Sequence, residues 1–261
     1  MSKLIQAIFP RNLFILLAKE LRGFFLSPIA YVVLGLVMVL GGFSFTAALT
    51  DLKTGAEART LAVHTFNSPQ FWLAYFFIFP VLTMRLFAEE QKLGTIETLY
   101  TAPVKSIHIL MAKYLAALIF YAVLWIPSLI NFAIFGMTCP DDTGAIGSLW
   151  GSYSIIFLIG VFNLAIGCFA SALTANQLVA AMICFTICLL HFLFGILMEV
   201  VKGDNISPAL LEFSEYVSTI GHVRSFVDGL IDTRPFVYYI SFAALILFFT
   251  HHVLQYRKWK T

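Results

Sequence analysis

The densest group of charged side chains lies in residues 88–103, AEEQKLGTIETLYTAP, within a chain that is otherwise mostly apolar. Three of these side chains, Glu89, Glu90 and Glu97, are carboxylates that could bind a metal, exchange protons or face a cationic partner. The chain contains neither an HExxH zinc motif nor a GxxxxGK[ST] phosphate loop. We therefore expect no metal site, no catalytic residue and no nucleotide site in this chain.

The same stretch carries the pattern of a short helix. Gly94 permits a break because a residue without Cβ tolerates strained backbone angles. Thr95 can then cap a new helix that runs to about Tyr100, with Glu97 in the first turn, where a carboxylate favours the positive end of the helix dipole. Pro103 cannot continue a helix. This helix would present its carboxylates to a docked partner, and the alternative is a solvated loop whose charges only keep it out of the lipid.

Two polar side chains stand alone inside apolar runs. Asn163 and His191 are candidates for an intramembrane polar site, since polar residues at depth are often functional. The alternative is that each forms hydrogen bonds to a neighbouring helix and stabilises packing. Cys184 and Cys188 share a helix face, and we interpret them as small packing residues because no further metal ligand is close in the sequence.

The composition is that of an integral membrane protein. Of the 261 residues, 60% are hydrophobic and 11% are charged, with a mean hydropathy of +0.90. A water-soluble domain carries about 25% charged residues. The membrane admits only helices or closed barrels, and the long unbroken apolar runs favour helices. The fold class is therefore all-α.

Six apolar runs are long enough to cross a bilayer, which needs roughly 20 residues per helix. Pro80 and Pro127 lie inside the second and third runs, where we expect them to kink the helices. The predicted spans are 29–49, 71–87, 107–136, 150–174, 177–200 and 236–256.

Orientation follows from the Lys and Arg residues of short loops, which favour the cytoplasm. Basic residues gather in the N-terminal segment, in the connection between the second and third spans, and in the C-terminal tail. The loop around Asp141 and Asp142 has none. We therefore expect both termini and the 88–106 connection in the cytoplasm, in a multi-pass protein.

Two amphipathic segments are predicted not to cross. In residues 11–26, apolar side chains recur at helical spacing, while Lys19, Glu20 and Arg22 would be costly at depth. This segment should lie in the headgroup layer. Residues 207–231 begin with Ser207 as a helix cap, and should form one or two amphipathic helices at the outer interface.

The stretch RLFAEEQKLGTIETLYTAPV closely resembles the cytoplasmic motif of ABC-2 type permeases, in which a Glu pair precedes GT-x-E and a proline. The stretch lies between the second and third of six spans, which is similar to the position of the motif in the family. The amphipathic helix ahead of span one resembles the connecting helix of the family. DTGAIGSLWGSY, FASALTANQLVAA and HVRSFVDGLIDTRPFVYYISF resemble the branch of the gliding-motility permease GldF. The resemblance covers nearly the whole chain.

The resemblance implies the permease subunit of an ATP-binding-cassette transporter in the bacterial cytoplasmic membrane, with a single domain over residues 1–261. The resemblance of the motif implies a coupling element that docks on a cytoplasmic ATPase. That ATPase would hold ATP and Mg²⁺, whereas this chain would hold no cofactor. Two ATPase subunits and a second permease are implied. That permease is either a different chain with an extracytoplasmic domain or a second copy of this one. Lipid is expected as a partner and nucleic acid is not. The coupling element comprises Glu89, Glu90, Gly94, Thr95, Glu97, Tyr100 and Pro103.

Two other classes compete with this interpretation. One is a membrane scaffold that anchors an ATPase to an extracytoplasmic machine without transport. The other is a gradient-driven carrier, which paired carboxylates in the spans would favour. The chain lacks such pairs, and His191 is the one feature in the carrier's favour. The sequence does not specify a substrate.

Overall fold

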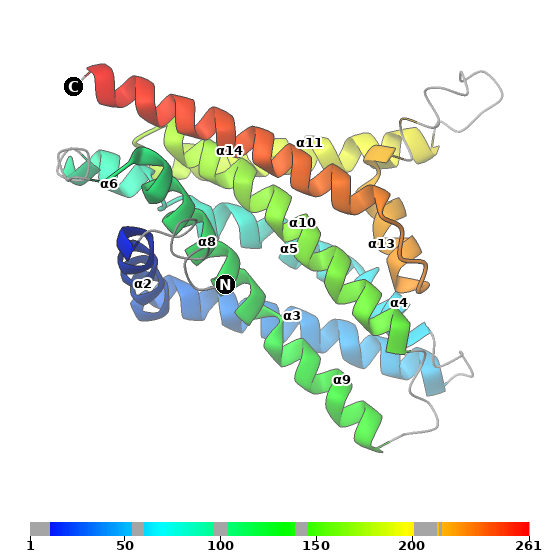
Figure 1. Cartoon of the computed structure of the whole chain (residues 1–261). Helices are drawn as coiled ribbons and strands as arrows, with labels where there is room; N and C mark the ends of the chain where they lie inside the picture. The colour runs from blue at the N-terminus through cyan, green and yellow to red at the C-terminus, as the bar shows by residue number, and fades with distance from the viewer. Residues whose placement is uncertain are drawn as a thin grey trace.

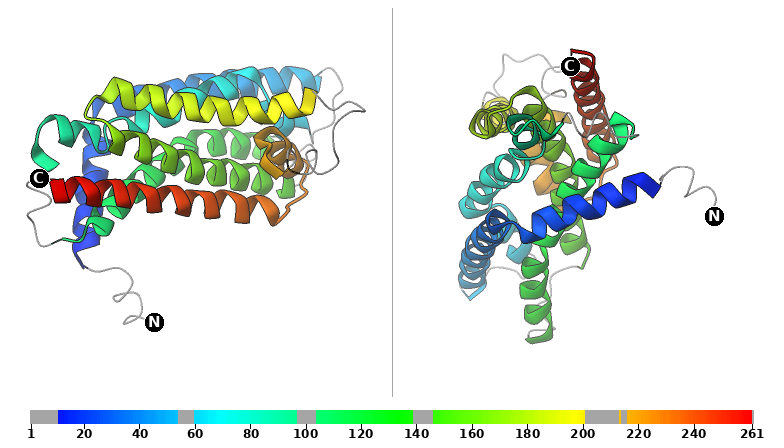
Figure 2. Two further views of the ribbon diagram at one scale, coloured as in Figure 1. Left: turned by 90° about the horizontal axis from the view of Figure 1, so that it is seen from above. Right: turned by 90° about the vertical axis from the view of Figure 1, so that its left-hand side faces the viewer.

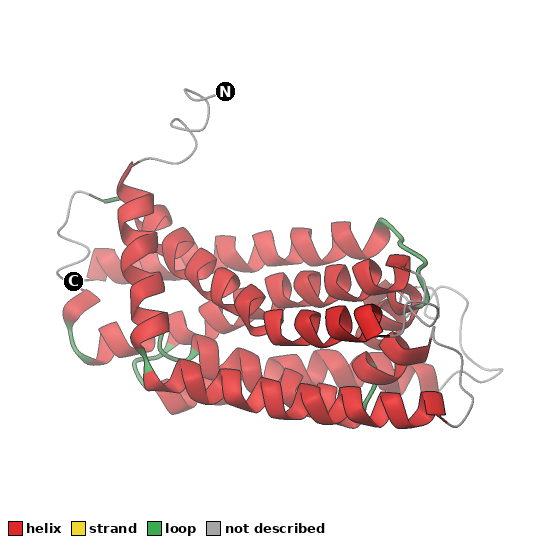
Figure 3. Ribbon diagram, turned by 90° about the horizontal axis from the view of Figure 1, so that it is seen from below, coloured by secondary structure: helices red, strands yellow, loops and turns green. Residues whose placement is uncertain are grey.

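The computed structural model describes residues 11–53, 60–96, 104–138, 146–200, 213 and 216–260. Within these ranges the regular structure is helical and contains no strand, in agreement with the all-α prediction (Figure 1, Figure 3). The described residues contain six helical stretches long and apolar enough to cross a membrane. The chain is an all-α integral membrane protein.

The crossing helices are close to the predicted spans in position. They end in short loops or in smaller helices. Their bounds are α3 (Pro28–Lys53), α5 (Pro69–Thr83), α8 (Ser106–Leu124) with α9 (Ile126–Thr138), α10 (Ile146–Leu173), α11 (Gln177–Val200) and α14 (Arg234–Lys260). The smaller helices are α2 (Arg11–Leu26), α4 (Thr60–Phe66), α6 (Ala88–Lys92) and α13 (Thr219–Val227).

Helix α10 is the centre of the bundle. The protein itself buries 83% of its most apolar window, against 22% for α3 and 28% for α11 and for α14. It packs against α5, α8, α11, α13 and α14. The span of α5 is also mostly buried, at 61%, whereas α3, the α8–α9 span, α11 and α14 present most of their apolar surface outward, as expected for helices that face lipid or a partner subunit.

The two prolines inside spans behave differently. The third span is interrupted at Trp125, two residues before Pro127, and divides into α8 and α9. The interruption lies next to the proline at which a kink was predicted. Helix α5 instead runs through Pro80 to Thr83 without interruption.

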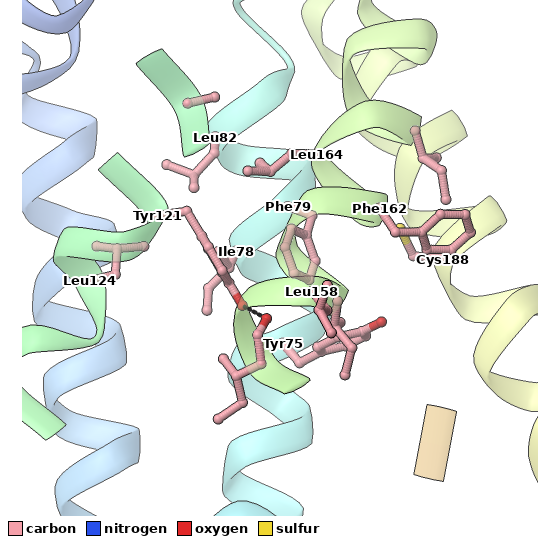
Figure 4. Packing of buried hydrophobic residues seen from close by; sticks show 14 of the residues in the cluster. Tyr75, Ile78, Phe79, Leu82, Tyr121, Leu124, Leu158, Phe162, Leu164 and Cys188 are labelled. Carbon is pink, nitrogen blue, oxygen red and sulfur yellow. Dashed lines mark hydrogen bonds between the residues drawn. The ribbon is translucent and has the colours of Figure 1, made fainter. Parts of the chain in front are cut away.

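Close packing on α10 depends on glycine. A Cβ added at Gly160 would lie 2.1 Å from the Tyr121 ring, and one at Gly167 would lie 2.1 Å from the Thr83 hydroxyl oxygen. The Tyr121 ring cannot move aside freely, because its hydroxyl donates to the Ile156 carbonyl at 2.9 Å. Figure 4 shows this ring with Phe79 and Leu158 in the core between α5, α8 and α10.

We expect Gly160→Ala to lower the free energy of unfolding by about 1–3 kcal/mol, the usual cost of overpacking a filled core. Thermal unfolding of the detergent-solubilised protein measures this. Gly41→Ala is the matched control, since a Cβ at Gly41 has no atom within 4 Å. Equal melting temperatures for the two variants would contradict the packing.

At the end of the bundle away from α2 and α6, α4 and α13 cover the spans (Figure 1, Figure 2). Helix α4 was not predicted. Helix α13 starts at the Ser218 cap, whose hydroxyl accepts from the Gly221 N–H, and it ends before Gly229, which has φ +82°.

Within its described part, the segment predicted over 207–231 as one or two amphipathic helices contains α13. Its apolar residues Val223, Phe226 and Val227 are buried against the protein. His222 shares a hydrogen bond with the Tyr239 hydroxyl at 3.1 Å, and burial lowers the pKa of His222 to about 4. The imidazole is thus neutral at pH 7 and acts as a packing group. Residues 201–212, which include the predicted cap Ser207, lie outside the described residues.

Helix α2 has the predicted bounds and lies across the axes of the spans (Figure 2). Its apolar side chains pack on α8, and Leu13 is buried there. The sequence analysis did not predict the partner of Glu20, which is a buried lysine of α8.

Candidate functional site

The start of the charged stretch is held against the end of α10. Helix α5 stops at Thr83, and a turn at Met84–Phe87 precedes α6. The reason is Ser171. Its hydroxyl accepts from the N–H groups of Phe87 at 3.0 Å and Ala88 at 3.1 Å, and donates to the Met84 carbonyl at 3.3 Å. These contacts satisfy backbone groups that a helix break leaves open.

The break after α6 occurs at Gly94, as predicted, with φ +69°. Thr95 and Ile96 are helical again. Thr95 is therefore inside the new helix rather than its cap, and its hydroxyl donates to the Glu90 carbonyl at 3.4 Å. Glu97, Tyr100 and Pro103 lie outside the described residues.

A buried ion triad joins this stretch to α2 and α8. The Lys113 Nζ lies 2.9 Å from Glu90 Oε1 and 3.2 Å from Glu20 Oε2. The lysine side chain is only 3% exposed, and the two carboxylates are 16% and 20% exposed. Its Nζ also lies 5.6 Å from the centre of the Phe87 ring. A buried charge persists only when it is paired in this way.

A second set of contacts reaches the C-terminal helix. The Gln91 amide donates to the Ala172 carbonyl at 3.2 Å and accepts from Arg257 Nη1 at 2.8 Å. Arg257 Nη2 donates to the Leu173 carbonyl at 2.7 Å. On the outer side of α6, Arg85 lies 3.8 Å from Glu89, one helical turn away.

Residues 84–96 are thereby fixed to helices from both ends of the chain. Glu90 connects to α2 and α8, while Gln91 and Ser171 connect to α10 and α14. These are ion pairs and hydrogen bonds. Among the described residues, no group of three His, Cys, Asp or Glu could hold a metal. The arrangement can transmit a displacement of the 88–103 stretch to four helices at once.

The structure places Asn163 in the core, apart from the charged stretch. Its Nδ2 donates to the Tyr75 hydroxyl at 2.7 Å and to the Ile159 carbonyl at 3.0 Å. Its Oδ1 is buried and has no hydrogen-bond partner among the described residues. The contact with Tyr75 links α5 and α10 in the way that interhelical packing residues do.

His191 bonds to two other elements. Its Nε2 shares a hydrogen bond with the Tyr238 hydroxyl of α14 at 2.9 Å, and its Nδ1 lies 3.4 Å from the Thr219 hydroxyl of α13. Its ring also packs 5.0 Å from that of Phe162. Both ring nitrogens are thus engaged in contacts between helices.

Several residues of this arrangement were missed by sequence reasoning. A lysine inside an apolar span is itself a signal, because an unpaired one is costly in a bilayer, and Lys113 could have been found that way. Glu20 could then have been paired with it. Ser171, Gln91 and Arg257 carry no such signal, since a polar residue at the end of a span is common.

A family model described as "ABC-2 family transporter protein" matches residues 22–201, which is more than half of the chain. The matched range contains the charged stretch, Lys113 and Ser171, whereas Glu20 and Arg257 lie outside it. The comparison with curated proteins found no match.

Proposed function

Because the chain belongs to the ABC-2 family of transporter proteins, we propose that residues 88–103 couple a partner ATPase to movement of its spans. The chain is a multi-pass membrane permease of this family. ATP binding and hydrolysis on the partner would displace the stretch. The displacement would open or close the spans to move a substrate, or to perform mechanical work, across the membrane.

The observation that supports this proposal most strongly is the way in which α6 is held. A solvated loop would need no buried partner, yet Glu90 meets a lysine that is 3% exposed and Ser171 takes two backbone N–H groups. Through such contacts, a displacement of α6 would move the adjoining ends of α2, α8, α10 and α14 together. Coupling residues are Glu89, Glu90, Gly94 and Thr95 in the described part, and Glu97, Tyr100 and Pro103 beyond it.

The complex would contain two ATPase subunits, which hold ATP and Mg²⁺, and a second permease. We favour a different second chain with an extracytoplasmic domain over a second copy of this one. This choice, and placement near the GldF-like branch, rests on sequence resemblance alone. Purification of the complex with two copies of this chain and no other permease would refute it.

The proposed orientation puts α2, α6 and the end of α14 in the cytoplasm of a bacterium, at the inner membrane. These elements lie at one end of the bundle (Figure 1). A cysteine at position 92 that reacts from outside intact cells with a reagent that does not cross membranes would contradict this orientation.

We expect the chain, purified alone, to show no ATP hydrolysis, because it lacks a phosphate loop. Purification in mild detergent from its own host should bring down an ATPase that carries such a loop, and hydrolysis should appear with it. ATP hydrolysis by the isolated chain would contradict the proposal. So would a complex that holds the chain and other membrane proteins but no ATPase.

The scaffold interpretation remains the second candidate. The same contacts that would transmit motion could also make a rigid anchor for a docked ATPase. The two differ in whether hydrolysis is needed once the ATPase is bound. The carrier interpretation is weaker, since both ring nitrogens of His191 are engaged in hydrogen-bond contacts.

A further inference from the structure

A cavity of about 380 Å³ lies beside the ion triad, between α2, α3, α5, α6 and α8. Part of its wall is apolar and includes Phe24, Ala30 and Leu82. Another part is charged, and is formed by the triad together with Arg85 and Glu89. Because α2 is amphipathic and lies across the spans, this cavity is at the level of the membrane interface (Figure 2).

The charges around the cavity do not balance. Arg85 and Glu89 form one pair, but Lys113 faces two carboxylates, which leaves one net negative charge. Glu90 Oε1 binds the lysine, whereas Glu90 Oε2 is buried and does not face the cavity. The net negative charge of the lining therefore favours a ligand that brings a positive charge, and an N–H group lets such a ligand donate to a carboxylate.

The apolar wall adds a second requirement. A small cation from solution would use only the charged side, whereas an amphiphile uses both. Membrane phospholipids meet this cavity at their headgroups. A zwitterionic headgroup also carries a phosphate, for which Arg85, 41% exposed and lining the cavity, supplies a guanidinium.

We propose that this cavity binds an ethanolamine phospholipid, with its primary ammonium donating to the carboxylates that line the cavity and its phosphate beside Arg85. The choline headgroup has the same charge but no N–H, so it cannot donate to these carboxylates. A glycerol headgroup lacks the positive charge. Glu89 and Glu90 line the cavity and are also proposed coupling residues, but the lining residues all belong to this chain, so lipid binding is measured without the ATPase.

Native mass spectrometry of the full purified chain, titrated with phosphatidylethanolamine or phosphatidylcholine, tests the proposal. We expect the ethanolamine lipid to bind about tenfold more tightly, which is the order of one hydrogen bond to a charged group. Glu90→Gln should remove most of that difference. Soluble phosphoethanolamine should not displace the lipid, because it cannot use the apolar wall. Equal affinity for the two lipids, or displacement by the soluble compound, would overturn the proposal.

A pair of glycine variants locates the site. A Cβ at Gly23, which lines the cavity, has no atom within 4 Å, so Gly23→Leu should fill the space without touching the triad. Gly35→Leu, also in open space but outside the cavity lining, is the matched control. We expect the first variant to lose the preference for the ethanolamine lipid and the second to keep it. Retention by both, in protein with unchanged thermal unfolding, would show that the lipid binds elsewhere.

Discussion

The Lys113→Met variant is expected to lose about 3 kcal/mol of folding free energy, because it leaves two carboxylates without their buried cation. The value is at the low end for broken buried pairs. Glu20 and Glu90 keep 16% and 20% exposure, so water offsets part of the loss. Thermal unfolding in detergent, followed by dye binding to exposed cysteines, measures the effect.

Two controls separate charge from side-chain size. Lys92→Met removes an exposed lysine from the same end of the protein and should leave the unfolding temperature nearly unchanged. A variant that combines Lys113→Met with Glu20→Gln and Glu90→Gln should regain most of the lost stability, since neutral replacements of buried ion groups are often tolerated. If Lys113→Met unfolds at the wild-type temperature, the triad does not stabilise the junction of α2, α6 and α8.

The second large effect is expected from Glu97→Lys, which reverses a charge in the proposed docking surface. Reversal at a charged interface should cost roughly 2 kcal/mol, or about 30-fold in affinity for the ATPase. The spans should still insert. The measurements are the amount of ATPase that co-purifies and the hydrolysis rate per complex.

Asp232→Lys changes the net charge by the same amount at the opposite end of the bundle and should leave the ATPase bound. A Glu97→Lys permease with normal ATPase binding and full activity would mean that the stretch is a solvated loop. An ATPase variant that docks but cannot hydrolyse ATP distinguishes a transporter from a scaffold. If the protein is a transporter, function should be lost with this ATPase variant. If the protein is a scaffold, function should be kept.

Sequence patterns were sufficient for the spans, because hydropathy and length alone define a helix that crosses a bilayer. They were also sufficient for the break at Gly94 and the interruption before Pro127, since both are local properties of a residue type. The range of α2 followed from apolar spacing in the same way.

Contacts between distant residues could not be read from such patterns. The turn after Thr83 forms because Ser171, 83 to 87 residues away in sequence, supplies hydrogen bonds to it. Likewise Glu20 meets Lys113 across 93 residues. The sequence predicted an amphipathic segment where α13 lies, but its stripe of Val223 and Val227 does not specify which helix it packs on. Its packing on α10 is a contact between distant residues.

Photo-crosslinking from position 93 tests the central claim most directly. Leu93 is 66% exposed beside Gly94, and Leu230, 69% exposed at the other end of the bundle, is its matched control. A photoreactive residue at 93 in living cells should form an adduct with an ATPase that carries a phosphate loop, identified by mass spectrometry, and position 230 should form none. An ATPase that co-purifies with the chain but is crosslinked from neither position, or from 230 alone, would contradict docking at residues 88–103.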